Sequence, residues 1–197
     1  MNIAVFASHG GSDLQAIIDA CQSGRLDAEV RAVFSNNGDS LALKRAKDHG
    51  IPAFHFSEKV IENPEALEKA ILDTLLESKI HIIFLAGYLK KLGRTILKLF
   101  ENHVYNIHPS LLPKYGGKGM YGIHVHTAVL DAKETETGIT IHRVNEEYDD
   151  GEIIAQTRVP VLNGDTPETL AARVLEQEHV FIVEVLAKIL NDSFSRP

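Results

Sequence analysis

Short apolar segments alternate with amphipathic segments along the first half of the chain. Residues 3–7 and 30–34 are runs of β-branched, aromatic and small apolar side chains, which are typical of buried strands. Between these runs, Leu14, Ile17 and Ile18 recur at the spacing of one helix face. Strands that alternate with helices favour an α/β fold, with a mostly parallel, twisted sheet and helices on both of its faces.

The alternation continues and then changes near residue 115. We expect further strands at residues 52–56, 80–86, 103–107, 139–144 and 153–161, and further helices at residues 41–49, 67–75, 96–100 and 167–190. The glycine-rich segment around residues 116–122 predicts a functional or mobile loop. We expect the C-terminal part of the sheet to include an antiparallel strand, and residues 1–197 to form one domain.

Composition narrows the classes of partner. The formal net charge is -7 over 197 residues, so the chain lacks the basic surplus that non-specific binding to nucleic acid or an anionic membrane needs. No apolar run approaches the roughly 20 residues of a membrane-spanning helix. Cys21 is the only cysteine, which excludes an intrachain disulfide and favours a cytoplasmic location. Small-molecule substrates are the expected partners.

Residues 106–113, which read NIHPSLLP, carry the most informative chemistry. Asn106 and His108 are two positions apart at the end of an expected strand, so their side chains point the same way. Ligands of open α/β sheets bind at such strand ends. An amide can donate a hydrogen bond to a developing oxyanion, and an imidazole can move a proton near neutral pH. A structural histidine is the alternative interpretation of His108.

Residues 8–13 join the first strand to the first helix. The glycines allow close approach of the backbone to a ligand, and the free N–H groups of a helix start attract an anion. The match to the dinucleotide pattern G-x-G-x-x-G is poor, so a single phosphate is the better hypothesis. An ordinary turn in which Ser12 or Asp13 caps the helix is an equal alternative. Asp13 would repel a phosphate unless it caps the helix and points away.

Two acidic segments allow both a functional and a structural interpretation. Asp149 lies in residues 146–151, which are typical of a surface turn. A carboxylate of this turn beside His108 would raise the pKa of the imidazole. Glu178 and His179 on the last helix are typical of a solvated charge pair.

A metal site is the less favoured interpretation of the histidines. His124 and His126 could bind a metal from a strand, but no cysteine or carboxylate cluster has the spacing of metal ligands. We therefore expect no metal.

The NIHPSLLP segment resembles the signature of the folate-dependent formyltransferases, and the resemblance covers nearly the whole chain. Four other features favour the members whose acceptor is 5′-phosphoribosylglycinamide. They are residues 2–8 with Gly11-Ser12, residues 33–36, residues 85–88 and residues 176–179. The resemblance implies a Rossmann-like formyltransferase fold, with a phosphate-binding N-terminal half and a catalytic, folate-binding C-terminal half. It also implies a role in de novo purine (IMP) biosynthesis.

The resemblance implies roles for particular residues. The catalytic group would be Asn106, His108 and Asp149. The ribonucleotide would contact Gly11, Ser12, Asp13 and Glu178. The folate would contact Leu89, Lys90, Lys91 and Leu92 together with Asn106. The peptide bond between Leu112 and Pro113 would be cis.

The implied reaction is attack of the glycinamide amine on the formyl carbon of 10-formyltetrahydrofolate. Asn106 and a protonated His108 would donate hydrogen bonds to the oxyanion, and Asp149 would keep His108 cationic. We therefore expect the imidazole to titrate above about 6.5. The folate would arrive as a co-substrate, with no tightly bound cofactor, and the protein would be a monomer or homodimer.

Several positions depart from the family pattern. The family usually has Gly at position 9 and Asn at position 13, where this chain has His9 and Asp13. Position 90 is commonly Arg, and Lys90 keeps the charge without the bidentate geometry. Pro64 stands where a cation for the folate tail often occurs, and Leu175 replaces a polar contact. These changes affect affinity more than chemistry.

Three other functions remain open. Relatives that formylate methionyl-tRNA normally carry an added C-terminal domain, and formyltetrahydrofolate hydrolases an added N-terminal domain. We expect neither domain here, and the acidic composition also argues against tRNA. A non-catalytic nucleotide-binding module on the same sheet is the third alternative.

Overall fold

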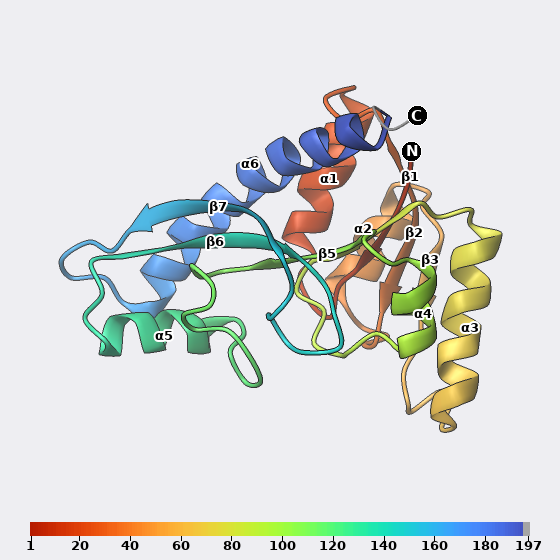
Figure 1. The fold of residues 1–197 in the computed structure, drawn as a ribbon, viewed down its shortest axis with the longest axis horizontal. Helices are drawn as coiled ribbons and strands as arrows, with labels where there is room; N and C mark the ends of the chain where they lie inside the picture. The colour runs from red at the N-terminus through yellow and green to blue at the C-terminus, as the bar shows by residue number, and fades with distance from the viewer. Residues whose placement is uncertain (195–197) are drawn as a thin grey trace.

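The computed structural model describes residues 1–194, which form one α/β unit around a seven-stranded sheet (Figure 1). In chain order the elements are β1 Asn2–Phe6, α1 Ser12–Gln22, β2 Glu29–Ser35, α2 Leu41–Asp48, β3 Ala53–His55, α3 Pro64–Glu77, β4 Ile82–Leu85, α4 Arg94–Leu99, β5 Val104–His108, α5 Ile123–Asp131, β6 Glu136–Arg143, β7 Ile153–Pro160 and α6 Pro167–Phe194. All the strands expected from the sequence are present, with bounds shifted by a few residues.

The sheet has the order β3-β2-β1-β4-β5-β6-β7. The pairs from β3 to β5 are parallel, β6 is antiparallel to β5, and β7 is antiparallel to β6. The prediction of a mostly parallel sheet with an antiparallel C-terminal part is therefore confirmed. The chain runs outward from β1 in one direction and from β4 in the other, so a crevice opens between their carboxyl ends.

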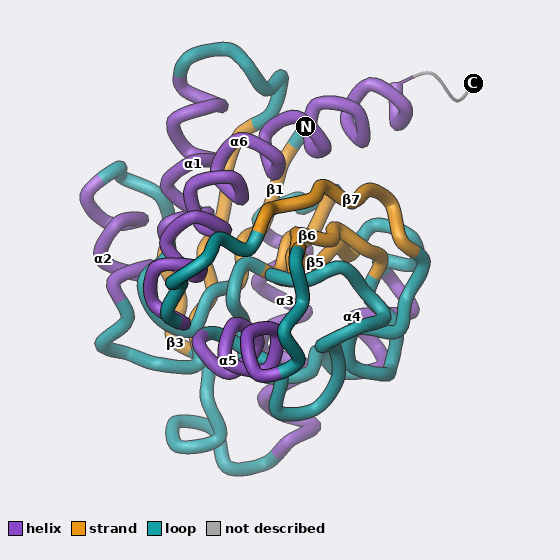
Figure 2. Tube along the Cα trace, turned by 90° about the vertical axis from the view of Figure 1, so that its left-hand side faces the viewer, coloured by secondary structure: helices purple, strands orange, loops and turns teal. Residues whose placement is uncertain are grey.

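Helices cover both faces of the sheet because the strands alternate their side chains. Along β1, Ile3 and Val5 belong to a core shared with α1, α2, α5 and α6, whereas Ala4 and Phe6 belong to a second core shared with α3 and α4. In the second core the rings of Phe6 and Phe34 stack with centroids 4.4 Å apart. On the first face α1 and α6 lie side by side (Figure 2).

Helix α6 is the long helix that its apolar spacing predicts. The expected stripe is buried against the sheet, and it consists of Ile182, Val185, Leu186 and Ile189. None of the helices within residues 1–194 is both long and apolar enough to cross a membrane.

The structure does not have the strand that the metal-site alternative for the histidine pair assumed. His124 and His126 lie on α5, a helix that the sequence pattern did not reveal, and not on a strand. The helix is favoured because Val125 and Val129, four positions apart, both pack into the core. Residues two positions apart on a helix point in different directions, so these two imidazoles do not face a common ion.

Helix α1 begins differently from either expected cap. Gly11 is the N-cap, with φ 65, and Ser12 and Asp13 lie inside the first turn. A side chain at Gly11 would be strained by this φ, and its Cβ would approach Ala42 to 2.8 Å. The helix ends at Gln22, and Gly24 follows with φ 75 as a left-handed terminator. Asp13 is thereby free of a capping role.

Candidate active site

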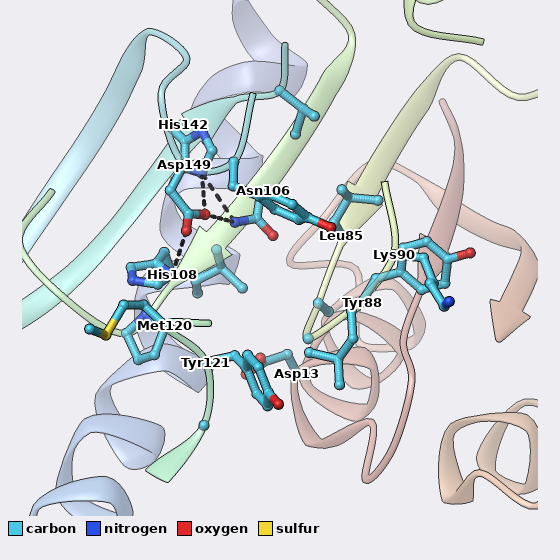
Figure 3. Close-up of a pocket in the computed structure, with 18 of the residues that line it drawn as sticks. Asp13, Leu85, Tyr88, Lys90, Asn106, His108, Met120, Tyr121, His142 and Asp149 are labelled. Carbon is cyan, nitrogen blue, oxygen red and sulfur yellow. Dashed lines mark hydrogen bonds and ion pairs between the residues drawn. The ribbon is translucent and has the colours of Figure 1, made fainter. Parts of the chain in front are cut away.

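A cavity of about 670 Å³ occupies the carboxyl ends of β1, β4 and β5 (Figure 3). All the residues that the sequence singled out for catalysis or binding line it: Gly11, Ser12, Asp13, Leu89, Lys90, Lys91, Leu92, Asn106, His108, Asp149 and Glu178. They come from the start of α1, the segment after β4, the end of β5, the turn before β7, and α6. The fold thus brings segments far apart in sequence around one cavity.

Ser8 ties together the loops that follow β1 and β4. Its Oγ donates to Asn36 Oδ1 at 2.5 Å and accepts from the Leu89 N–H at 2.9 Å, while its own N–H donates to the Gly87 carbonyl at 3.1 Å. Ser8 is buried, so these bonds lie out of water. They fix the two walls of the crevice relative to each other.

Asn106 and His108 project from β5 toward Asp149, as Figure 3 shows. The Asn106 amide nitrogen donates to Asp149 Oδ1 at 3.4 Å, and His108 Nδ1 lies 3.6 Å from Asp149 Oδ2. His108 is only 4% exposed. The three residues that the family resemblance joined are therefore in contact, although the local sequence around Asp149 is typical of a surface turn.

The turn that presents Asp149 is sterically constrained. Asp149 itself has φ 55, and a Cβ on Gly151 would fall 1.8 Å from the Arg143 carbonyl oxygen. Asp149 Oδ2 also accepts a hydrogen bond from the Gly117 N–H at 2.9 Å. The carboxylate is thus held by the turn on one side and by the glycine-rich loop on the other.

His142 completes this cluster, and the sequence analysis considered it only as one of several histidines. It is the antiparallel partner of Asn106 in the β5–β6 ladder. His142 Nδ1 lies 2.7 Å from the Arg143 carbonyl, which can only accept, so the proton is on Nδ1. Nε2 then accepts from the Asn106 amide nitrogen at 3.1 Å. His142 Nε2 also lies 3.6 Å from Asp149 Oδ1.

The expected direction of the His108 pKa was wrong. Burial lowers the pKa of His108 below 6.5 and outweighs the opposing effect of Asp149 and of the Tyr115 carbonyl; the nearby His142 lowers it further. His108 Nε2 lies 2.8 Å from the Tyr115 carbonyl, so this nitrogen carries the proton. In the neutral imidazole Nδ1 is therefore unprotonated and faces Asp149. Nδ1 of His108 can therefore accept a proton.

The loop after β5 reaches over the cavity. The Leu112–Pro113 peptide bond is cis, as the resemblance implied. The side chain of Tyr115 is fixed by Glu134, because the Tyr115 hydroxyl donates a hydrogen bond to Glu134 Oε1 at 2.9 Å. Lys114 Nζ donates to the same oxygen at 2.7 Å. Residues 117–124 then line the cavity. The glycine-rich loop is thus joined to the His108–Asp149 contact through Tyr115 and Gly117.

Glu178 is not part of a solvated charge pair, because it is only 7% exposed and lines the cavity. Asp13, whose side chain is 12% exposed, lines the same cavity from the start of α1, and Asp13 Oδ1 is 3.8 Å from His179 Nε2. Burial raises the pKa of Asp13 to about 6. Burial, and then the charge of Asp13, raise the pKa of Glu178 well above 4.5.

The segment after β4 presents its two lysines beside acidic groups. Lys90 Nζ lies 3.5 Å from Glu58 Oε1, and Lys91 Nζ lies 3.4 Å from Glu147 Oε2. Lys91 Nζ also donates to the Glu146 backbone carbonyl at 2.5 Å. Lys91 also lies 4.7 Å from the centre of the Tyr148 ring. The departures Pro64, the first residue of α3, and Leu175, on α6, do not line the cavity.

His126 is buried beside the cluster without belonging to it. Burial, and then the charge of His108, lower the pKa of His126 to about 4. Its Nδ1 has no hydrogen-bond partner among residues 1–194. Within the same residues no group of three histidine, cysteine or acidic side chains is placed to hold a metal ion.

The sequence pattern of the formyl transferase family matches residues 1–186. Over 191 residues the chain is 41% identical to the chloroplastic phosphoribosylglycinamide formyltransferase of Arabidopsis thaliana, covering 96% of this chain and 65% of that protein. It is 37% identical over 187 residues to phosphoribosylglycinamide formyltransferase of Escherichia coli strain K12, covering 95% of this chain and 86% of that one. The chain therefore belongs to the formyl transferase family.

The fold agrees with this assignment. The crystal structure of phosphoribosylglycinamide formyltransferase from Bacillus halodurans superposes with a TM-score of 0.90 at 35% identity, covering 98% of this chain and 97% of that one. The chain spans less than two thirds of the length of the Arabidopsis relative.

Proposed function

We propose that the protein transfers the formyl group of 10-formyltetrahydrofolate to the amine of 5′-phosphoribosylglycinamide, a step of de novo purine (IMP) biosynthesis, in the cytoplasm. One observation carries the proposal: Asn106, His108 and Asp149 contact one another in a single cavity. The start of α1 lines the same cavity and offers free N–H groups to a phosphate. Residues 85–92, which also line this cavity, would contact the folate.

The proposed step begins with attack of the amine nitrogen on the formyl carbon. The new C–N bond forms, and the formyl oxygen becomes an oxyanion. Neutral His108, whose free Nδ1 faces Asp149, takes the proton released by the amine, directly or through one water. Asp149 stabilises the resulting imidazolium. Holding both substrates in one cavity contributes proximity worth several kcal/mol.

The second half of the step returns the proton. The new Nδ1–H of cationic His108 and the side-chain amide of Asn106 donate hydrogen bonds to the oxyanion. For this the Asn106 amide releases one of its bonds to His142 or Asp149. When the tetrahedral intermediate collapses, the bond between the formyl carbon and the folate nitrogen breaks. That nitrogen takes the proton from His108, which leaves tetrahydrofolate and the formylated ribonucleotide.

The binding roles follow from position in the cavity. Gly11, Ser12 and Asp13 would contact the phosphate, and Glu178 the glycinamide end. Leu89 to Leu92, together with Asn106, would contact the folate. We expect no tightly bound cofactor, no nucleic-acid or membrane partner, and a monomer or homodimer.

The test is formyl transfer by purified protein with both substrates and with each omitted in turn. The folate product is followed by absorbance and the formylated nucleotide by mass. We expect turnover only when both substrates are present. Folate consumption without the ribonucleotide would indicate a hydrolase instead, and absence of product would move the assignment to another acceptor or to a binding protein.

A further inference from the structure

Two largely buried carboxyl groups line the cavity where α6 packs against α1. Asp13 lies in the first turn of α1, and Glu178 lies on α6, which packs against α1. Figure 3 places Asp13 on the same cavity as His108. Asp13 Oδ1 has no hydrogen-bond partner among residues 1–194, and Glu178 is 7% exposed. A buried polar group that lacks a partner in the protein is free to bind a ligand.

The basic groups near this pair do not neutralise it. His179 Nε2 is 3.8 Å from Asp13 Oδ1, beyond hydrogen-bonding distance, and burial and then Arg45 lower the pKa of His179. Arg45, on α2, is engaged elsewhere, because its Nε donates to the Gly10 carbonyl at 2.9 Å and its Nη1 to Gln15 at 3.1 Å.

The same end of the cavity also carries groups that attract an anion. The first backbone bond of α1 runs from Gln15 N–H to the Gly11 carbonyl, so the N–H groups of Ser12, Asp13 and Leu14 are not used by the helix. The partial positive charge of the helix start favours a phosphate there. Two ionised carboxylates would oppose that binding, whereas a protonated carboxyl would donate to a phosphate oxygen.

We propose that the Asp13–Glu178 pair takes up a proton when the phosphate of the acceptor binds, and that protonated Asp13 donates a hydrogen bond to a phosphate oxygen, so that phosphate binding is coupled to proton binding. The inference rests on the proposed function, which supplies the phosphate. Asp13 then acts as the neutral donor that an amide would provide at the same position. Specificity for a phosphorylated acceptor thereby depends on pH.

The electrostatics of the pair agree with this role. Burial raises the pKa of Asp13, and burial with the charge of Asp13 raises the pKa of Glu178. Two like charges in one buried site share a proton because both cannot ionise cheaply. A bound phosphate adds negative charge and strengthens this tendency. Affinity for the phosphate therefore falls as rising pH removes the last proton of the pair.

The experiment measures binding of ribose 5-phosphate by calorimetry between about pH 6.5 and 9, in buffers of different ionisation enthalpy. Most of the probe is already a dianion there, because its second pKa is about 6. For the wild type we expect affinity to fall at least about tenfold toward pH 9, with proton uptake on binding. In Asp13→Asn the affinity should change by less than about twofold, without uptake.

Two further variants separate this role from a structural one. Asp19→Asn removes an exposed carboxylate from the same helix and should keep the wild-type pH dependence. Glu178→Gln removes the neighbouring charge, so the fall in affinity should begin at lower pH. Wild-type affinity that is independent of pH, or an equal fall in Asp13→Asn, would overturn the inference.

A formyl-transfer assay at about pH 7 separates this result from the proposed function. Product formation together with pH-independent phosphate binding would refute the proton-coupled pair and leave the transferase assignment standing. Absence of product with proton-coupled binding of ribose 5-phosphate would refute the transferase assignment and support the carboxyl pair.

Discussion

The backbone carbonyl of Tyr115 accepts a hydrogen bond from Nε2 of His108 over 2.8 Å, and this contact decides which nitrogen of the His108 imidazole is basic. With the proton fixed on Nε2, Nδ1 is the site that can take a proton, and it lies 3.6 Å from Asp149. Tyr115 in turn belongs to the loop that continues along the cavity. The position of that loop and the protonation of His108 are therefore linked.

The pH dependence of transfer follows from the state of His108. Because burial lowers the pKa of His108 below 6.5, the imidazole is neutral at pH 7 and can act as a base. Activity is lost as pH falls through the lowered pKa, so the acid limb of kcat/KM for the folate should lie below about pH 6.5. The measurement is a kcat/KM profile with the ribonucleotide saturating. Activity that falls as pH rises through the pKa of His108, instead of as pH falls, would show that His108 must be cationic in the free protein.

Removal of either partner in the His108–Asp149 contact should reduce turnover. We expect His108→Ala and Asp149→Asn each to lower kcat by at least about a hundredfold, the scale of a lost proton-transfer or oxyanion interaction. In Asp149→Asn the acid limb should also move to lower pH, because the carboxylate raises the pKa of His108.

Steady-state kinetics with a thermal melt checks both variants. The matched control is His103→Ala, which removes an exposed histidine just before the opposite end of β5. Near-normal kcat in His108→Ala or Asp149→Asn would exclude the assigned roles, whereas a lowered melting temperature alone would indicate a structural effect.

His142 should act as a positioning residue for Asn106. In His142→Phe the Asn106 amide loses its acceptor at 3.1 Å, so the side chain is held less firmly for oxyanion binding. We expect kcat to fall about tenfold with little change in KM, the pattern of an interaction made in the transition state. The acid limb should rise toward higher pH, because His142 lowers the pKa of His108.

Measured profiles of kcat and KM against pH test this role. A purely structural role for His142 would change the melting temperature without moving the acid limb. A change in KM alone would place His142 in substrate binding.

Local sequence predicted Asn106 and His108 because the period of a strand puts both on one side at a carboxyl end. It could not predict His142, since the register of β6 against β5 is set by the turn and the sheet rather than by residues near His142. Asp149 was assigned only through the family resemblance. Its approach to His108 depends on a turn with φ 55 that the acidic composition does not reveal.

Tertiary packing also decides two features that the sequence did not reveal, the helix α5 and the burial of Glu178 on α6. The apolar positions Val125 and Val129 are too few to distinguish a short helix from a strand. Glu178 belongs to a sequence of charged residues, and only the packing of α6 against α1 shows that it is buried. Burial also reversed the expected pKa of His108, because desolvation depends on the whole fold.

Asp13→Asn should stabilise the protein, and the gain should grow with pH. The pKa of Asp13 is about 6 in the folded protein, above the 3.8 that is usual for an aspartate, so between these values the folded state binds more protons than the unfolded state. Stability therefore falls as pH rises from about 4 to 6, and above pH 6 the ionised group destabilises the fold. Asparagine has the same shape and does not ionise. We expect a gain of about 3 kcal/mol at pH 8 and much less at pH 4.

Urea unfolding of the two proteins at several pH values measures this difference directly. Asp19→Asn is the control, because that carboxylate is exposed and its loss should change stability by less than about 0.5 kcal/mol. An equal gain at every pH would mean that Asp13 destabilises the fold through packing rather than charge. A loss of stability at pH 8 would mean that the carboxylate is favourably paired in solution, and the burial of an unneutralised pair at the start of α1 would then be the wrong description of this end of the cavity.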